Sequence, residues 1–178
     1  HEKDVRAMGR PASGVQGMRL RKGDEVIEVD IADPDADLLV VTENGWGKRT
    51  RVLDYPVKGR GGLGVKTAQL VEGKGKLAGA RIVRDGYAVM LISDGGTVIR
   101  MAVDDIKRSG RSTQGVIVMR PRDGEKVATL AREALKLLEA QDLLTHSRLL
   151  ACPLQTLVVV AHPRDERMDQ LLLHGLVP

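Results

Sequence analysis

The 178-residue sequence has no phenylalanine, one tryptophan, two tyrosines and a single cysteine, Cys152. Aromatic residues make up only 2% of the chain, so its core must be built from valine, isoleucine, leucine and methionine. One cysteine excludes an internal disulfide framework, and four scattered histidines lack the spacing of metal ligands. We therefore expect no disulfide-stabilised fold and no metal site.

Long apolar runs are absent as well. None approaches the roughly 20 residues that a membrane span requires, and no charged leader with an apolar stretch opens the chain. We therefore expect a cytoplasmic protein with no membrane partner. The sequence also starts at His1 without a methionine, which favours a piece of a longer protein.

Acidic residues are outnumbered in the first part of the chain. Residues 1–127 carry 23 Lys and Arg against 18 Asp and Glu, whereas residues 128–178 carry 5 and 6. The net charge of +4 is a mild bias toward acidic partners such as nucleic acid. The basic excess belongs to the first part alone.

A repeat of about 50 residues organises that part. RPASGV starts at Arg10, RGGLGV at Arg60 and RSTQGV at Arg111, and residues 38–65 align with residues 89–116 at a constant shift of 51. Each unit contains a short β-branched run, an Asn-Gly or Gly-Gly turn and a return strand, the pattern of a hairpin. Four strands in a unit of this length are typical of a propeller blade. Further strands are predicted near residues 26–31, 65–71, 77–83 and 116–119.

We predict a mainly β chain. Residues 1–130 should form a partial β-propeller or β-pinwheel of about three four-stranded blades, and residues 131–178 an α-helical or mixed tail rich in leucine. The stripe from Leu130 to Leu138 predicts a helix, LQTLVVVAHP a buried strand, and DQLLLHGL a second short helix. We expect this tail either to be poorly ordered or to pack on an open blade edge.

The stretch KGRGGLGV contains the pattern GxGxxG. A dinucleotide site needs these glycines between a strand and a helix, but Pro56 precedes the loop and a predicted strand follows it. Two interpretations stay open. The glycines form an anion nest for a backbone phosphate beside an arginine, or they only permit positive φ while the arginines clamp neighbouring blades. The candidate phosphate-loop glycines are Gly61, Gly62, Gly64 and Gly115.

Three segments together, residues 6–20, 43–65 and 95–120, resemble the later blades of the C-terminal domain of DNA gyrase A. The phrases NGWGKRT, DYP and GRSTQGV carry the resemblance in register. Of the family's QRRGGKG box, only Arg60, Gly61, Gly62 and Gly64 match here. The loop is therefore similar to a degenerate copy, and an intact box is expected upstream.

This resemblance implies a six-bladed β-pinwheel that wraps double-stranded DNA on a basic rim and so supports ATP-dependent negative supercoiling by a type II topoisomerase. The implied partners are the rest of gyrase A and gyrase B in a heterotetramer, in the bacterial cytoplasm. ATP and Mg²⁺ would act elsewhere in that enzyme, so no cofactor is expected here. Tyr55 and Tyr87 do not match the family's catalytic tyrosine, so this segment should not be catalytic alone.

Binding should be indifferent to base sequence, because lysine and arginine neutralise phosphates and release counterions. Two alternatives stay open: the equivalent domain of topoisomerase IV, and a kelch-like propeller that binds protein or sugar. The candidate DNA contacts are Arg10, Arg19, Arg21, Lys22, Lys48, Arg49, Arg51, Arg60, Lys66, Arg100, Lys107, Arg108 and Arg111.

Overall fold

The computed structural model of the chain describes residues 6–133, 156–162 and 171–174. This part is built of strands and two 3-10 turns, and none of its helices is long and apolar enough to cross a membrane. The strands are β1 (Glu25–Ala32), β2 (Asp37–Thr42), β3 (Trp46–Arg51), β4 (Leu77–Val83), β5 (Ala88–Ser93), β6 (Val98–Ala102), β7 (Val116–Ile117), β8 (Val127–Glu133), β9 (Thr156–His162) and β10 (Leu171–His174).

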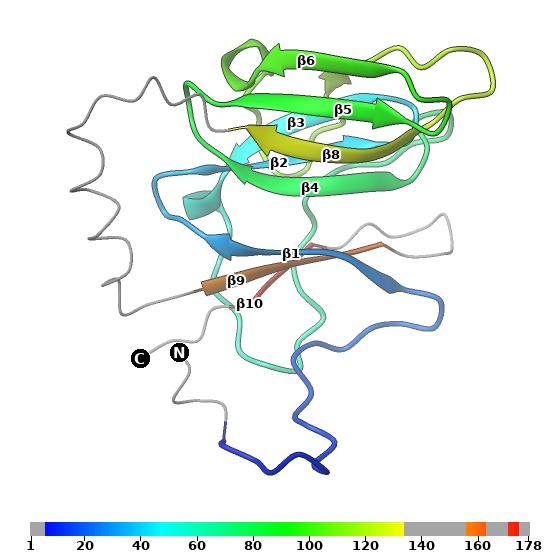
Figure 1. Cartoon of the computed structure of the whole chain (residues 1–178). Helices are drawn as coiled ribbons and strands as arrows, with labels where there is room; N and C mark the ends of the chain where they lie inside the picture. The colour runs from blue at the N-terminus through cyan, green and yellow to red at the C-terminus, as the bar shows by residue number, and fades with distance from the viewer. Residues whose placement is uncertain (1–5, 134–155, 163–170, 175–178) are drawn as a thin grey trace.

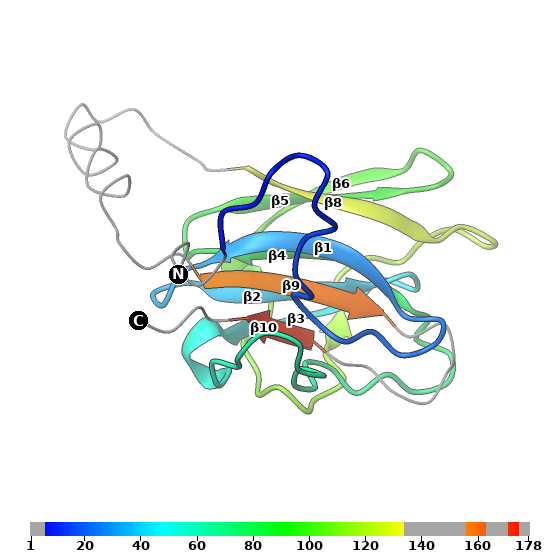
Figure 2. The same ribbon diagram turned by 90° about the horizontal axis from the view of Figure 1, so that it is seen from below.

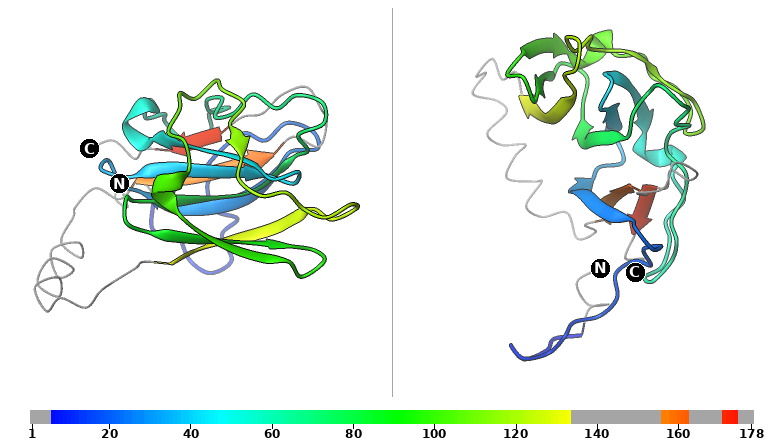
Figure 3. Two further views of the ribbon diagram at one scale, coloured as in Figure 1. Left: turned by 90° about the horizontal axis from the view of Figure 1, so that it is seen from above. Right: turned by 90° about the vertical axis from the view of Figure 1, so that its right-hand side faces the viewer.

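The strands form three antiparallel sheets with the orders β1-β9-β10, β4-β2-β3-β7 and β6-β5-β8. The sheets lie one upon another with the four-stranded sheet in the middle (Figure 1), and they follow one another around an arc in the right panel of Figure 3. The two sheets built from the repeats are small and antiparallel, as propeller blades are, and the chain is mainly β as predicted. Only the middle sheet shows four strands among the described residues.

Strands are exchanged between repeats. The hairpin β2-β3 is flanked by β4 on one side and by the short β7 on the other, although β7 comes about 65 residues later in the chain than β3. The next hairpin, β5-β6, is flanked on the β5 side by β8, which takes the place of β4. Each repeat therefore completes the sheet of the repeat before it, which ties neighbouring blades together.

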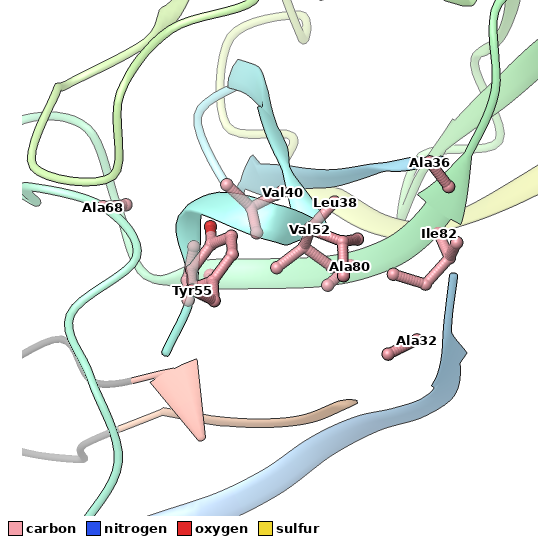
Figure 4. Packing of buried hydrophobic residues seen from close by; sticks show 10 residues of the cluster. Ala32, Ala36, Leu38, Val40, Val52, Tyr55, Ala68, Ala80 and Ile82 are labelled. Atoms are coloured by element: carbon pink, nitrogen blue, oxygen red, sulfur yellow. The ribbon is translucent and has the colours of Figure 1, made fainter. Parts of the chain in front are cut away.

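Both faces of the middle sheet are covered, and this explains the unbroken apolar run of β2. Leu38 and Val40 pack in a cluster with Ile82 between the middle sheet and β1 (Figure 4), whereas Leu39 and Val41 pack in a second cluster toward β5. All six residues of β2 are buried. A strand with one solvated face would alternate apolar and polar residues instead.

The β1 sheet lies at one end of the stack, as Figure 2 shows from below. Ile27 and Ala32 of β1 pack against the middle sheet, whereas Val29 and Ile31 are about half exposed, at 51% and 50%. Their counterparts in β4, 51 residues later, are buried because β1 covers that strand. The apolar sequence of β1 thus follows the blade pattern even where no blade covers it in the described part of the chain.

Three predicted elements differ from the structure. Residues 65–71 form no strand and run instead as an extended loop. The helix expected from Leu130 begins as strand β8, because Leu130 pairs with Leu91 and joins the core. The segment LLLH forms β10 rather than a second helix, while β9 confirms the strand predicted in LQTLVVVAHP. The remainder of the expected helix lies outside the described residues.

A close backbone approach fixes Gly45 in the turn of the first hairpin. Its φ is +76°, and an added Cβ would lie 2.0 Å from the carbonyl oxygen of Met119. Gly96, the equivalent residue of the next repeat, has φ +82° with nothing within 4 Å of the same position. The two glycines share a conformation and differ only in what stands beside them.

We predict that Gly96→Ala lowers the free energy of unfolding by about 1 to 2 kcal/mol, the cost of a left-handed residue with a side chain. Gly45→Ala should cost about 2 kcal/mol more, because the Met119 carbonyl must also move. Urea denaturation of the two variants measures this difference. Equal midpoints for both would show that the contact with Met119 does not constrain the turn.

Candidate nucleic-acid interface

Three loops from successive repeats lie side by side on one surface, which we name the loop layer: residues 10–22, 57–70 and 107–115. Backbone hydrogen bonds join them. Arg19 N donates to Gly62 O at 3.0 Å, Gly61 N donates to Gly17 O at 2.8 Å, and Gln69 N donates to Thr113 O at 3.1 Å. The repeated loops of the sequence thus become one continuous surface.

The charge of the loop layer is of one sign. Its three segments contain ten lysines and arginines and no aspartate or glutamate. All of these cations are exposed except Arg111, which is half-buried. They are Arg10, Arg19, Arg21, Lys22, Lys58, Arg60, Lys66, Lys107, Arg108 and Arg111. A surface with this composition attracts a polyanion.

Lys48 does not belong to that surface. Its side chain is buried, 1% exposed, and Nζ donates to Gly110 O and Arg111 O, each at 2.6 Å, and to Thr113 Oγ1 at 3.1 Å. Burial lowers the pKa of Lys48 from 10.5 to about 8, which leaves the ammonium charged at neutral pH. Predicted as a DNA contact, this lysine instead holds one loop of the loop layer from beneath.

Arg49 is buried as well and also binds the chain next to a loop of the loop layer. Its Nε donates to Ile106 O at 2.7 Å, and Nη1 pairs with Asp37 at 3.3 Å and, more closely, with Asp85. The hydrogen bond from Arg49 lowers the pKa of Asp85. Arg108 joins the same cluster, with Nε 2.8 Å from Asp37 Oδ2. The positive charges of both arginines are thus balanced within the chain.

The other candidates divide by their position. Arg100 is exposed and pairs with Glu133 at 2.7 Å, outside the loop layer. Arg51 is exposed at the end of β3. The structure thus brings nine of the thirteen predicted cations together in the loop layer, among them the acid-paired Arg108. The other eight are Arg10, Arg19, Arg21, Lys22, Arg60, Lys66, Lys107 and Arg111.

The glycines of these loops allow backbone conformations and close contacts that a side chain would prevent. Gly61, Gly64 and Gly115 have φ of +70°, +83° and +79°, whereas Gly62 does not have positive φ. A Cβ on Gly115 would lie 2.7 Å from Gly47 O, so this glycine allows the exchanged segment to approach β3. The N–H of Gly61 is used by Gly17, which removes it from any anion nest. Positive φ thus accounts for Gly61, Gly64 and Gly115, and a phosphate contact of these loops stays a prediction.

Aromatic side chains contribute little to the exposed surface. Tyr55 is buried, its hydroxyl 2.5 Å from Thr67 Oγ1, and burial raises its pKa. Trp46 is half-buried, and Lys74 Nζ lies 3.5 Å from its ring centroid. Tyr55 fills the space between strand and loop, as Figure 4 shows, and neither ring is free to stack on a base.

Sequence reasoning missed two features of this site. Lys58 is exposed in the loop layer, but in the sequence it stands out only as a departure from the QRRGGKG box. The second feature is the absence of acids from the three loops. The sequence contains this information, but only the structure shows that the loops are neighbours. In the described residues no three His, Cys, Asp or Glu side chains are placed to hold a metal ion.

Stacked sheets, exchanged strands and joined loops define part of a β-propeller of the pinwheel type. A family model described as "DNA gyrase C-terminal domain, beta-propeller" matches residues 1–33, 36–84 and 88–132. The chain belongs to this family. The resemblance drawn from the sequence is therefore confirmed, and the kelch-like alternative has no support.

Individual relatives agree with this assignment. DNA gyrase A of Staphylococcus epidermidis is 43% identical over 133 residues, as is that of Staphylococcus aureus; the match covers 74% of this chain and 15% of each relative. A structure of the DNA gyrase A C-terminal domain matches with a TM-score of 0.67 at 26% identity, over 73% of this chain and 44% of that one. The C-terminal domain of DNA topoisomerase IV matches with a TM-score of 0.65 at 24% identity, over 82% and 46%, and shows the same fold.

Replacing Lys48 with methionine tests its structural role, because methionine keeps the apolar stem and removes the donor. We predict that Lys48→Met lowers the free energy of unfolding by about 1 to 3 kcal/mol, since buried carbonyls of the loop lose their partner. Lys107 lies in the loop that Lys48 holds, but its side chain is exposed. Lys107→Met should therefore change the free energy of unfolding by no more than about 0.5 kcal/mol. Urea denaturation compares them, and a stable Lys48→Met variant would show that the loop holds itself.

Proposed function

We propose that this chain binds duplex DNA along the loop layer, without preference for base sequence, as the C-terminal domain of DNA gyrase A. The observation that carries the proposal is the composition of the loop layer: ten cations and no acid in three adjoining loops. Membership of the gyrase family supports the same conclusion.

The physical requirement of wrapping explains why the cations are spread over several blades. Bending a few tens of base pairs costs about 1 to 10 kcal/mol, which many modest phosphate contacts must offset. Each contact contributes through the release of counterions and carries no base information. A repeated loop supplies such contacts at a regular interval around the arc of sheets.

The chain spans about 15% of the length of the curated relatives it matches. A role in the whole enzyme is therefore inferred from these relatives. We propose that it acts with the rest of gyrase A and with gyrase B in a heterotetramer in the bacterial cytoplasm. In that assembly wrapped DNA supports ATP-dependent negative supercoiling. ATP and Mg²⁺ would be bound elsewhere, and this chain would need no cofactor of its own.

A charge-matched pair of triple variants tests DNA binding. Arg60→Gln, Lys66→Gln and Arg111→Gln together remove three cations of the loop layer. Arg84→Gln, Arg100→Gln and Lys126→Gln remove three that pair with Asp33, Glu133 and Glu43 outside it. We expect the first variant to lose affinity for a duplex of about 40 base pairs, and its slope of log affinity against log salt to shrink by about 0.9 per cation.

The second variant keeps the wild-type slope, because its acids already neutralise those cations. Filter binding between about 50 and 200 mM salt measures both slopes. Equal losses in the two variants would mean that net charge rather than the loop layer attracts DNA, and an unchanged first variant would reject the proposal. Circular dichroism confirms that both variants fold.

A further inference from the structure

Strand β1 is a third copy of the strand that closes each blade. A shift of 51 residues places β1 on β4, and β8 follows β4 by 50. In both complete repeats this strand pairs with the first strand of a hairpin, β2 in one case and β5 in the other. The hairpin beside β1 is instead formed by β9 and β10, from residues 156–174.

The pairing of β9 reproduces the blade register in detail. β2 and β4 pair through five consecutive residues from Asp37↔Val83, then skip one residue in a bulge. β5 and β8 do the same from Ala88↔Glu133. β9 and β1 pair through five residues from Thr156↔Ala32 and reach the same bulge, between Val26 and Glu28. A register set by an accidental contact would have no reason to repeat this irregularity.

The second strand continues the match. Val41 pairs with Gly47 in the middle sheet, and Ile92 pairs with Val98 in the next. The equivalent residue of β9, Val160, pairs with Leu171 of β10. β10 therefore occupies the place that β3 and β6 occupy in their sheets (Figure 1).

The sequence of β9 agrees with its place. TLVVVA aligns with DLLVVT of β2, and Leu157, Val159 and Val160 are identical to their counterparts. The central four residues of both runs, LLVV in β2 and LVVV in β9, are apolar. β10 differs from β3: leucines stand at the positions of Lys48 and Arg49, so this hairpin lacks the cations that hold a loop of the loop layer.

We propose that β9-β10 is a built-in substitute for a blade hairpin, and that the edge of β1 is a strand-acceptor site which this hairpin of the same chain occupies. An open edge of unpaired N–H and C=O groups is a template for pairing with other chains. β9 closes that edge along the full length of β1. The site recognises an apolar, β-branched strand of the blade type, so a true blade hairpin would compete for it.

Cysteine pairing tests both the register and the identity of the occupant. In a Cys152→Ser background, Val29→Cys with Val159→Cys joins directly paired positions, whereas Val29→Cys with Val158→Cys joins positions one residue out of register. Residues directly opposite in an antiparallel pair lie within disulfide reach. We expect the first pair to oxidise within a monomer at least about tenfold faster than the second.

Two outcomes overturn the proposal. Equal oxidation of both pairs would show that β9 has no fixed register on β1. A disulfide found only in covalent dimers would show that a second copy of the chain supplies the hairpin. Non-reducing electrophoresis and mass spectrometry separate these outcomes from the expected one.

Hydrogen exchange gives a second test without cysteines. Val159→Pro removes a backbone N–H from the middle of β9, and amides of β1 should then exchange about tenfold faster or more. Amides of β4 and β8 should keep wild-type rates, which confirms that the other two sheets remain folded. Unchanged exchange in β1 would show that β9 does not protect it. Neither test depends on DNA binding, so the proposed function stands or falls separately.

Discussion

The organisation of this molecule depends on a buried ammonium group. Lys48 Nζ lies under the loop layer with three oxygen acceptors from residues 110–113, which belong to the following repeat. A charge buried in this way is costly unless it is paired or fully hydrogen-bonded, so the loop and the lysine need each other. Arg49 adds a second tether through the carbonyl of Ile106. Through these cations the position of a surface loop is determined by the sheet of its neighbour.

Equivalent residues take different roles because their neighbours differ. Arg49 and Arg100 stand 51 residues apart at the same place in their return strands. The exchanged segment around Arg108 covers Arg49, and an acid at the start of β2 balances it. No such segment covers Arg100 in the described part of the chain, and it lies in solvent beside Glu133. The repeat therefore specifies the backbone, while strand exchange decides whether a side chain is structural or exposed.

This explains which parts can be predicted from the sequence. The sequence predicts a strand at residues 77–83 and β4 lies there, because apolar β-branched residues and flanking glycines mark a strand locally. The sequence places Lys48 on the surface because lysine is usually exposed, and nothing local shows that a loop 62 residues later covers it. The leucine-rich tail gives the opposite error: apolar residues spaced for a helix also suit a strand when a sheet edge is available. Pairing partners, rather than propensity, decide both cases.

The cations of this chain are of two kinds: some pair with an acid of the chain, and others lie in loops that contain no acid. Only the second kind should count toward the proposed binding of DNA. Some arginines lie against acids, as Arg84 does with Asp33 after the end of β4 and Arg108 does with Asp37 within the loop layer, so a phosphate that approached them would have to displace a carboxylate. Counterion release comes from cations that bring no acid with them. In this chain the loops of the loop layer contain no acid at all, while acids gather at strand ends and hairpin turns. The modest net charge of +4 therefore conceals an uneven distribution of charge, and the proposed DNA binding depends on that distribution relative to the blades rather than on the sum.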